Sequence, residues 1–191
     1  MIGSRSRVSL SRPTFCPKES ENISKKLARP GKPGAQPVYR NKPLQEHVHD
    51  SYRSRGKLPE PTLCPQCGAV FHDGRWQWLP KPEAAHREMC PACHRIHDRF
   101  PAGFVKLEGD FFTRHRAEII NLVHHIEKKG KAEHPLQRIM EIVDEHGAVL
   151  VTTTDIHLAH GIGEAVRHAY QGHLESHYNP EENLLRIHWK R

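Results

Sequence analysis

Two Cys-x-x-Cys pairs constrain this sequence more than any other feature. Cys64 and Cys67 form the first pair, Cys90 and Cys93 form the second, and 22 residues separate the two pairs. Two residues between cysteines let both sulfurs of a tight turn face one tetrahedral ion, and Gly68 follows the first turn. The spacing is typical of a zinc ribbon or a treble-clef knuckle pair. It predicts one Zn²⁺ bound by four thiolates.

Four thiolates would complete the coordination shell, so we expect a structural zinc with no open position for a reacting water. A redox dithiol is the alternative for a Cys-x-x-Cys pair, but no β-α-β pattern surrounds either pair. A disulfide framework is disfavoured because no apolar secretory segment is present at the N-terminus, which favours a reducing, cytoplasmic location. The fifth cysteine, Cys16, has no assigned role.

The insert between the two pairs has the pattern of a β-hairpin. The turn signal His72-Asp73-Gly74 separates two short strand-like runs. Trp76 and Trp78 fall on one face of the second run, where we expect them to cover the core of the module; stacking on a base or a partner is the alternative. Residues 104–107 predict a further strand. We assign residues 61–109 to this zinc module, whose perimeter carries Arg75, Arg87, Arg95 and Arg99.

Positive charge is concentrated in the first third of the chain. Residues 1–60 hold 13 Lys and Arg against 5 Asp and Glu, a net of +8, whereas residues 61–191 have a net of −1. The first segment is rich in proline and has little apolar periodicity. It cannot bury enough surface to offset its ordering entropy, so we expect a basic arm that is disordered when free.

Two functions fit such an arm. It can be a solvated tail that increases solubility, or it can bind nucleic acid, with Lys and Arg neutralising phosphates and Tyr39 and Tyr52 stacking on bases. For nucleic acid, the predicted contacts are Arg5, Arg7, Arg12, Lys25, Lys26, Arg29, Lys32, Arg40, Lys42, Arg53, Arg55 and Lys57 in the arm, with Arg75, Trp76 and Arg95 in the zinc module.

Residues 110–191 predict a small α+β domain with the order α-α-β-α-β-β. A first helix is expected from about residue 111 to 129, where Gly130 stops it. A second helix begins at Pro135 and ends before Gly147, because apolar residues recur there at i, i+3, i+4 and i+7. These residues are Leu136, Ile139, Met140 and Val143.

The second half of this domain predicts β-α-β-β. A buried strand over 148–152 precedes a third helix, which Thr154 or Asp155 can cap and which ends at Gly172. A phosphate site at this helix start is the alternative to capping. Two strands, 173–178 and 184–189, complete the domain.

No motif predicts catalysis. The chain contains no phosphate-binding P-loop, no dinucleotide-binding glycine pattern, no nucleophile elbow and no His-Glu-x-x-His. The longest aliphatic run, Ala148 to Val151, is far shorter than the roughly 20 residues that cross a bilayer. We therefore expect a protein that is not an enzyme and has no membrane partner and no evident small-molecule substrate.

Histidine is unusually frequent, with 17 residues in the chain. We expect solvated surface imidazoles. The alternatives are a second metal site, a general base or a pH-responsive contact, because imidazole changes charge just below neutrality. The groups concerned are His157, His160, Glu164 and His168 on the third helix, and His115, His124 and His125 on the first.

The cysteine pairs, together with Gly74-Arg75-Trp76 and Leu107-Glu-Gly109, resemble an uncharacterised bacterial zinc-ribbon family. The resemblance continues through Pro101-Ala-Gly103, His134-Pro-Leu136, Val151-Thr-Thr-Thr-Asp155 and Tyr170-Gln-Gly172, and it covers about residues 60–191. This family is associated with low-oxygen-induced gene clusters. The resemblance therefore implies a role in stress or stationary phase.

More distantly, the zinc module followed by a small α+β unit resembles the N-terminal part of the nonsense-mediated-decay protein three family, an adaptor of the large ribosomal subunit. Cys-x-x-Cys-Gly, Gly-x-Trp and the second Cys-x-x-Cys carry this resemblance. The chain lacks the adaptor's further N-terminal Cys-x-x-Cys pair and its long C-terminal domains. The resemblance therefore implies contact with ribosomal RNA and no role in export.

Three hypotheses of function follow. The first is a zinc-containing, ribosome-associated factor that binds rRNA through its basic arm and occupies a functional site, as in hibernation or subunit protection. The second is a redox-responsive or metal-responsive regulator that binds DNA or a protein partner and uses its cysteines as the sensor. The third is an enzyme that uses the His-rich third helix.

Overall fold

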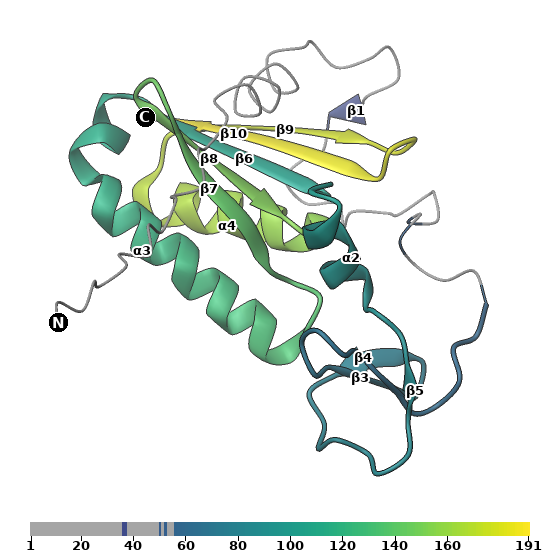
Figure 1. The fold of residues 1–191 in the computed structure, drawn as a ribbon. Helices are drawn as coiled ribbons and strands as arrows, with labels where there is room; N and C mark the ends of the chain where they lie inside the picture. The colour runs from purple at the N-terminus through teal and green to yellow at the C-terminus, as the bar shows by residue number, and fades with distance from the viewer. Residues whose placement is uncertain (1–35, 38–49, 51, 53–55) are drawn as a thin grey trace, which may run out of the picture. The chain divides into compact units, whose positions relative to one another are not determined.

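The computed structural model describes Gln36, Pro37, Asp50, Tyr52 and residues 56–191. These residues belong to one compact unit and form three helices and two β-sheets (Figure 1). The structure thus confirms a mixed α+β fold. Most of the predicted basic arm lies outside the described residues, although β1 (Gln36–Pro37) pairs antiparallel with β9 (His173–Asn179).

The smaller sheet builds the four-cysteine module. Its strands, in the order β4-β3-β2-β5, are β4 (Arg75–Gln77), β3 (Val70–His72), β2 (Thr62–Leu63) and β5 (His86–Arg87). Strands β3 and β4 are the predicted hairpin. Their turn residues Asp73 and Gly74 have φ values of 51° and 73°, as a type I′ turn requires. Helix α2 (Pro91–His97) starts at the second cysteine pair, with Cys90 as its N-cap residue.

The larger sheet and two helices form the α+β layer of the molecule, that is, a β-sheet with helices packed on one face. Its strands, in the order β1-β9-β10-β6-β8-β7, include β10 (Leu184–Lys190), β6 (Gly103–Glu108), β8 (Ala148–Thr153) and β7 (Ile139–Glu145). β10 runs parallel to β6, and the other pairs are antiparallel. Helices α3 (Asp110–Glu133) and α4 (Ile156–Tyr170) cover one face (Figure 1). No described helix is long and apolar enough to cross a membrane.

The core lies between this sheet and the two helices. On β10, Leu185, Ile187 and Trp189 are at most 1% exposed, which confirms the predicted alternation of buried residues. Ile119 and Val123 of α3 and Ile162 and Val166 of α4 are fully buried against the same sheet. The Trp189 indole donates a hydrogen bond to the Gln171 carbonyl, so the polar atom of this buried ring has a partner.

The predicted second helix is wrong, because residues 139–145 form strand β7. The apolar residues of this segment do not share one helix face. Leu136 packs against the cysteine cluster, whereas Ile139 and Ile142 pack against the core of the larger sheet. An irregular register between Ile139 and Glu141 also hides the two-residue period of a strand. The segment therefore contacts two cores, which produces a helix-like spacing without a helix.

The turn after β7 explains the role of Gly147. His146 and Gly147 have φ values of 39° and 88°, so they form the two-residue turn of the β7–β8 hairpin instead of a helix end.

The domain boundary also changes. The strand predicted at 104–107 exists as β6, but it lies between β10 and β8 in the larger sheet and not in the zinc module. Helix α3 continues past Gly130 to Glu133.

We predict that two glycines of α4 respond oppositely to the same substitution. A Cβ atom at Gly163 would lie 2.8 Å from Cγ2 of Ile187, whereas one at Gly161 meets nothing closer than 4.0 Å. Gly163→Ala should lower the free energy of unfolding by about 1–3 kcal/mol, because α4 must move off the sheet. Gly161→Ala should raise it by about 0.5–1 kcal/mol through helix propensity. Urea unfolding of both variants measures these changes, and equal effects would contradict this packing.

Candidate metal centre

The four cysteines of the two predicted pairs converge on one point. Their sulfur atoms all lie within 4.8 Å of one another. Sγ of Cys67 lies 3.7 Å from Sγ of Cys90, close to the roughly 3.8 Å that separates two thiolates on a tetrahedral ion with metal–sulfur bonds of about 2.3 Å. Cys64 and Cys90 are fully buried, Cys93 is buried and Cys67 is half-buried. The donor set therefore fits a single metal ion.

Local backbone contacts hold the first cysteine pair and join it to the second. The Cys64 amide donates to the Ala69 carbonyl over 2.8 Å, and the Gly68 amide donates to the Cys64 carbonyl over 2.9 Å. Gly68 has a φ of 79°, a value that suits glycine. The Cys90 amide donates to Sγ of Cys64 over 3.3 Å. These bonds fix the positions of the thiols in the folded module.

The closeness of the sulfurs sets their protonation. Hydrogen bonding from Cys90 holds the pKa of Cys67 well below its usual range. The hydrogen bond to Cys67 raises the pKa of Cys90, and the same kind of contact raises the pKa of Cys93 to about 11. Without a metal, the clustered thiols therefore do not all carry a negative charge at the same time. A bound divalent cation removes this conflict because it stabilises all the thiolates together.

Arg138 is a member of this centre that the sequence pattern did not reveal. Its Nη1 donates to Sγ of Cys93 over 3.3 Å, and its Nη2 lies 3.9 Å from Sγ of Cys90. Burial acts to lower the pKa of Arg138, but the hydrogen bonds and charges of the neighbouring thiols raise it, so the guanidinium stays charged. Four thiolates exceed the charge of a divalent ion by two, and Arg138 offsets part of the excess.

The backbone of Arg138 is tied to the start of α4. Its amide donates to Oγ1 of Thr154 over 3.0 Å, and the Thr154 amide donates to the Arg138 carbonyl over 3.0 Å. Asp155 then caps α4, accepting hydrogen bonds from the His157 and Leu158 amides. This confirms the predicted cap. The same contacts connect the metal centre to the α+β layer.

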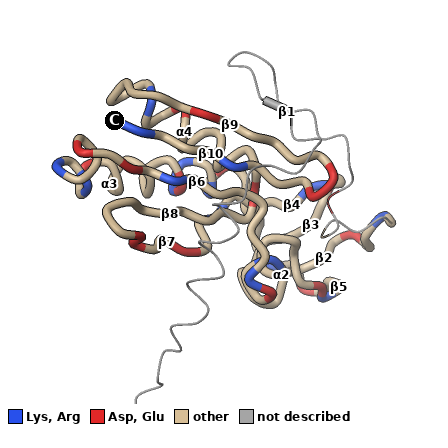
Figure 2. The backbone as a smooth tube through the Cα atoms, turned by 90° about the horizontal axis from the view of Figure 1, so that it is seen from above, with Lys and Arg blue, Asp and Glu red and all other residues tan. Residues whose placement is uncertain are grey.

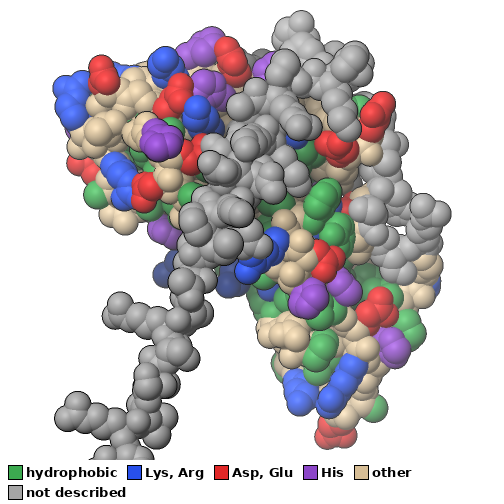
Figure 3. All heavy atoms as spheres, turned by 45° about the horizontal axis from the view of Figure 1, so that its top comes forward, with side chains coloured by type: hydrophobic (Ala, Val, Ile, Leu, Met, Phe, Trp, Pro, Cys, Tyr) green, Lys and Arg blue, Asp and Glu red, His purple; other side chains and the backbone are tan. Residues whose placement is uncertain are grey.

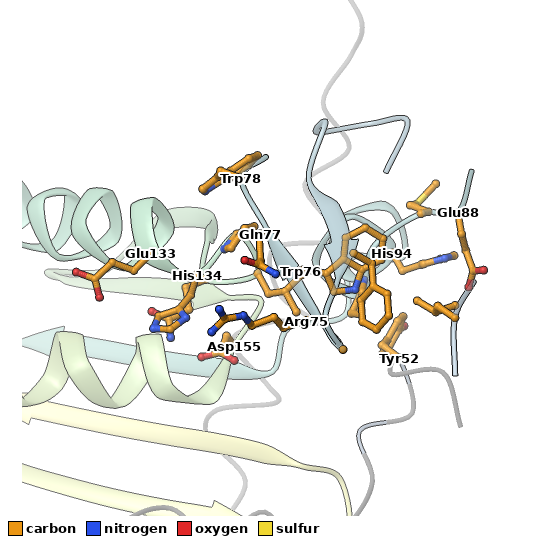
Figure 4. A pocket seen from close by; sticks show the side chains of 18 of the residues that line it. Tyr52, Arg75, Trp76, Gln77, Trp78, Glu88, His94, Glu133, His134 and Asp155 are labelled. Carbon is orange, nitrogen blue, oxygen red and sulfur yellow. The ribbon is translucent and has the colours of Figure 1, made fainter. Parts of the chain in front are cut away.

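The predicted nucleic-acid contacts differ in where they lie. Those from Arg5 to Arg55 are outside the described residues. Lys57 and Arg75 are exposed and Trp76 is half-buried, and all three line one cleft of about 1270 Å³ (Figure 4). Lys57 reaches this cleft from the end of the basic segment, and the other two reach it from the β3–β4 hairpin.

Arg95 is a correction to the predicted contacts. Its side chain is 2% exposed, and Nη2 lies 2.6 Å from Oδ1 of Asp50. Nη1 donates to the Phe100 carbonyl, and the guanidinium lies 4.5 Å from the ring centroid of Tyr52. A buried, paired arginine is not available for phosphate. The partner Asp50 lies 45 residues away in the sequence, so no local pattern indicates this pair. Tyr52, for which base stacking was one of the two alternatives, packs against Arg95 and Phe100.

The two tryptophans of the hairpin have different environments. Trp76 packs against the cysteine cluster, as predicted, and meets the Phe71 ring edge-on at 5.6 Å. Trp78 lies one residue beyond β4 and is 40% exposed. Its Nε1 donates to the Lys131 carbonyl over 2.6 Å. The expectation of a core position therefore holds for Trp76 and is wrong for Trp78.

The histidines of α4 do not assemble into a second metal site. Within residues 56–191, two groups bring three or more ligand atoms together, the four cysteines and the exposed set Glu60, His72 and Asp73. Glu164 instead accepts a hydrogen bond from Nε of Arg167. Burial lowers the pKa of His160. Figure 3 shows histidine side chains scattered among acidic and basic ones on the visible face.

The fold and the site together define a two-sheet α+β protein with a four-cysteine cluster that can hold one metal ion. No family model, curated protein or solved structure matches the sequence.

Proposed function

We propose that this protein is a cytoplasmic, zinc-containing factor that associates with the ribosome and binds ribosomal RNA. One observation carries the proposal. Lys57, Arg75 and Trp76, three of the residues predicted to contact nucleic acid, line the same cleft, Lys57 from the end of the basic segment and the other two from strand β4. Lys57 also ends the segment in which the excess positive charge lies. Cations and an aromatic ring therefore line one cleft close to the end of the basic segment.

The donor set supports zinc as the ion. A cluster of four cysteine sulfurs matches the ligands of closed structural zinc sites. The resident metal then supplies folding stability to the small module and leaves the chemistry of the function to the protein surface. We assign no catalytic step to this centre.

The distribution of charge supports different roles for residues 1–60 and residues 61–191 in RNA binding. Residues 61–191 have a net charge of −1, and Figure 2 shows acidic and basic positions interleaved over the described chain. This domain by itself attracts a polyanion only weakly. Most of the electrostatic attraction to RNA must therefore come from residues 1–60, whose net charge is +8. Binding that depends on released counterions weakens steeply as salt rises.

The stress role is the most specific part of the proposal. The resemblance to a family associated with low-oxygen gene clusters favours action during hibernation or subunit protection. A factor without catalytic groups acts there by occupying a functional site of the ribosome. The expected partners are ribosomal subunits in oxygen-limited cells.

We predict that neutralising the N-terminal cations removes ribosome association. The variant replaces nine residues with glutamine, namely Arg5, Arg7, Arg12, Lys25, Lys26, Arg29, Lys32, Arg40 and Lys42. It retains Asp50 and Tyr52, because they contact the buried Arg95. In sucrose gradients from oxygen-limited cells, the natural chain should migrate with 50S or 70S particles at low salt. For the variant, the fraction of protein that migrates with these particles should be at least about tenfold smaller.

Lys128→Gln with Lys129→Gln is the matched control, since both side chains are exposed on α3, and it should migrate as the natural chain does. A natural chain that stays at the top of the gradient under every condition would contradict ribosome association. A nine-residue variant that still migrates with ribosomes would remove these cations from the mechanism.

A thiol-based sensor is the second candidate function, and Arg138 is the observation that favours it. Arg138 contacts the cysteine sulfurs and, through Thr154, the start of α4, so loss of the metal would alter contacts beyond the module. Half-buried Cys67 gives an oxidant access to the centre. Peroxide at low micromolar doses should then release zinc to a chromophoric chelator and change partner binding. A centre that is inert to peroxide would eliminate this candidate.

A further inference from the structure

The cleft beside the metal module is too large for a typical small-molecule site. Its volume is about 1270 Å³, against roughly 300–1,000 Å³ for pockets that enclose small ligands. The β3–β4 hairpin, the segment after α3 and the start of α4 line it (Figure 4). A cleft of this size and open shape suits a segment of a polymer.

An exposed but oriented indole forms one side of the cleft. Trp78 is 40% exposed, yet its hydrogen bond to the Lys131 carbonyl holds the ring in one position. Arg138 of the metal centre lies 5.9 Å from its ring centroid. An aromatic side chain that is already held loses little conformational freedom when a flat ring stacks on it. Trp78 is therefore a prepared stacking surface.

Polar side chains from three parts of the chain also line the cleft. Figure 4 shows Arg75 of the hairpin directed toward His134, which follows α3, and toward Asp155 at the start of α4. A guanidinium supplies N–H donors, a carboxylate supplies acceptors and an imidazole supplies either. Donors and acceptors beside an aromatic surface are the groups that recognise the edges of unpaired bases.

The charges of the residues that line the cleft favour bases over phosphates as its ligands. Lys57 and Arg75 are offset by Glu88, Glu133 and Asp155, so the cleft offers no net positive charge when its histidines are neutral. The surplus of cations lies instead in the segment that ends at Lys57, with Arg53 and Arg55 four and two residues earlier in the sequence. The lining therefore suits uncharged bases better than phosphates.

We infer that this cleft binds unpaired bases of single-stranded RNA, with Trp78 as the stacking surface and Arg75, His134 and Asp155 as the groups that contact base edges. The inference rests on the proposed RNA-binding function and specifies the form of RNA that is bound. A duplex does not fit, because its bases are stacked and paired inside the helix and cannot reach Trp78.

The test uses the full, metal-loaded chain and an oligouridine of about 12 nucleotides, a length within the range of single-stranded binding sites. Anisotropy of the labelled RNA reports affinity, and tryptophan fluorescence reports stacking. Trp78→Ala should weaken binding about tenfold or more and should remove most of the fluorescence quenching. Trp78→Phe keeps a flat ring but loses the hydrogen bond to the Lys131 carbonyl, so its affinity should lie between those of the natural chain and Trp78→Ala. Ile96→Ala, at a site that is 41% exposed and outside the cleft, is the matched control.

Each result has a distinct meaning. Salt-sensitive RNA binding that Trp78→Ala leaves unchanged would overturn the cleft site while leaving the proposed function intact. Equal affinity for the oligouridine and for a duplex of the same length would also overturn it. No RNA binding at low salt would overturn both.

If Trp78→Ala impairs folding, a measurement on the natural chain still tests the inference. Photocrosslinking of the natural chain to oligouridine that contains 4-thiouridine should then label peptides that include residues 75–78 and 132–137. Crosslinks confined to other peptides would overturn the inference. Arg75→Gln, at an exposed side chain, provides a second variant with the same expected loss of affinity.

Discussion

Cys90→Ser, or removal of the metal by a chelator, is expected to unfold the four-cysteine module. The core cluster of this module consists of the small buried side chains Cys64, Cys90, Ala92 and Cys93, with Trp76, Met89 and Leu136 partly buried against it. Such a core buries too little apolar area to fold alone. The metal-binding free energy, about 10 kcal/mol or more for structural zinc in small modules, is then the main stabilising contribution.

Hydrogen exchange measures this effect directly. Amides of β2, β3 and α2 should lose their protection when the metal is removed, whereas the amides of β6, β8 and β10 should retain most of theirs, since a separate hydrophobic core protects them. Cys16→Ser is the control, because Cys16 is not among the four clustered cysteines. Protected amides throughout the chelated module would show that the metal is dispensable for folding.

Arg138→Met is expected to weaken metal binding by about 10-fold to 100-fold, which corresponds to about 1.4–2.7 kcal/mol. The guanidinium donates to Sγ of Cys93 and lies beside Sγ of Cys90, so its removal leaves thiolate charge without a donor in a buried site. Methionine keeps much of the side-chain volume and isolates the electrostatic contribution. Competition with a chelator of known affinity measures the change.

Arg116→Met is the matched control for this substitution. Arg116 also pairs with a side chain far away in the sequence, with Nη2 at 2.7 Å from Oδ1 of Asp144, but both side chains are largely exposed. An exposed pair contributes at most about 1 kcal/mol, and this one does not touch the metal centre. Its metal affinity should stay unchanged. Equal metal affinity for Arg138→Met and the natural chain would show that the arginine only fills space.

Signals that act within a few residues predicted their structures correctly. The turn that holds the first cysteine pair, the Asp73-Gly74 turn and the Asp155 cap each depend on hydrogen bonds or dihedral angles of neighbouring residues. The alternation of buried residues on β10 is equally local. These features indicated a four-cysteine module that can hold a metal ion, followed by an α+β domain.

The misassigned segments all depend on contacts between distant residues. Residues 136–143 were predicted to be helical because their apolar side chains recur at helical spacing, but Leu136 packs against the cysteine cluster and Ile139 against the core of the larger sheet. Residues 104–107 were assigned to the zinc module because they follow it in the sequence. Their hydrogen-bonded neighbours, β8 and β10, come about 45 and 80 residues later.

The amino-acid sequence by itself determined which residues can bind a metal, where the basic charge lies and most of the local elements. Only the tertiary structure decided that Arg138 joins the metal centre, that Arg95 is buried beside Asp50, and that Trp78 and Asp155 line one cleft. The physical reason is the distance along the sequence between the residues that interact. Turns, caps and metal-ligand spacing are set by bonds along a short stretch of chain, whereas the neighbours of a long side chain depend on how the separate elements pack.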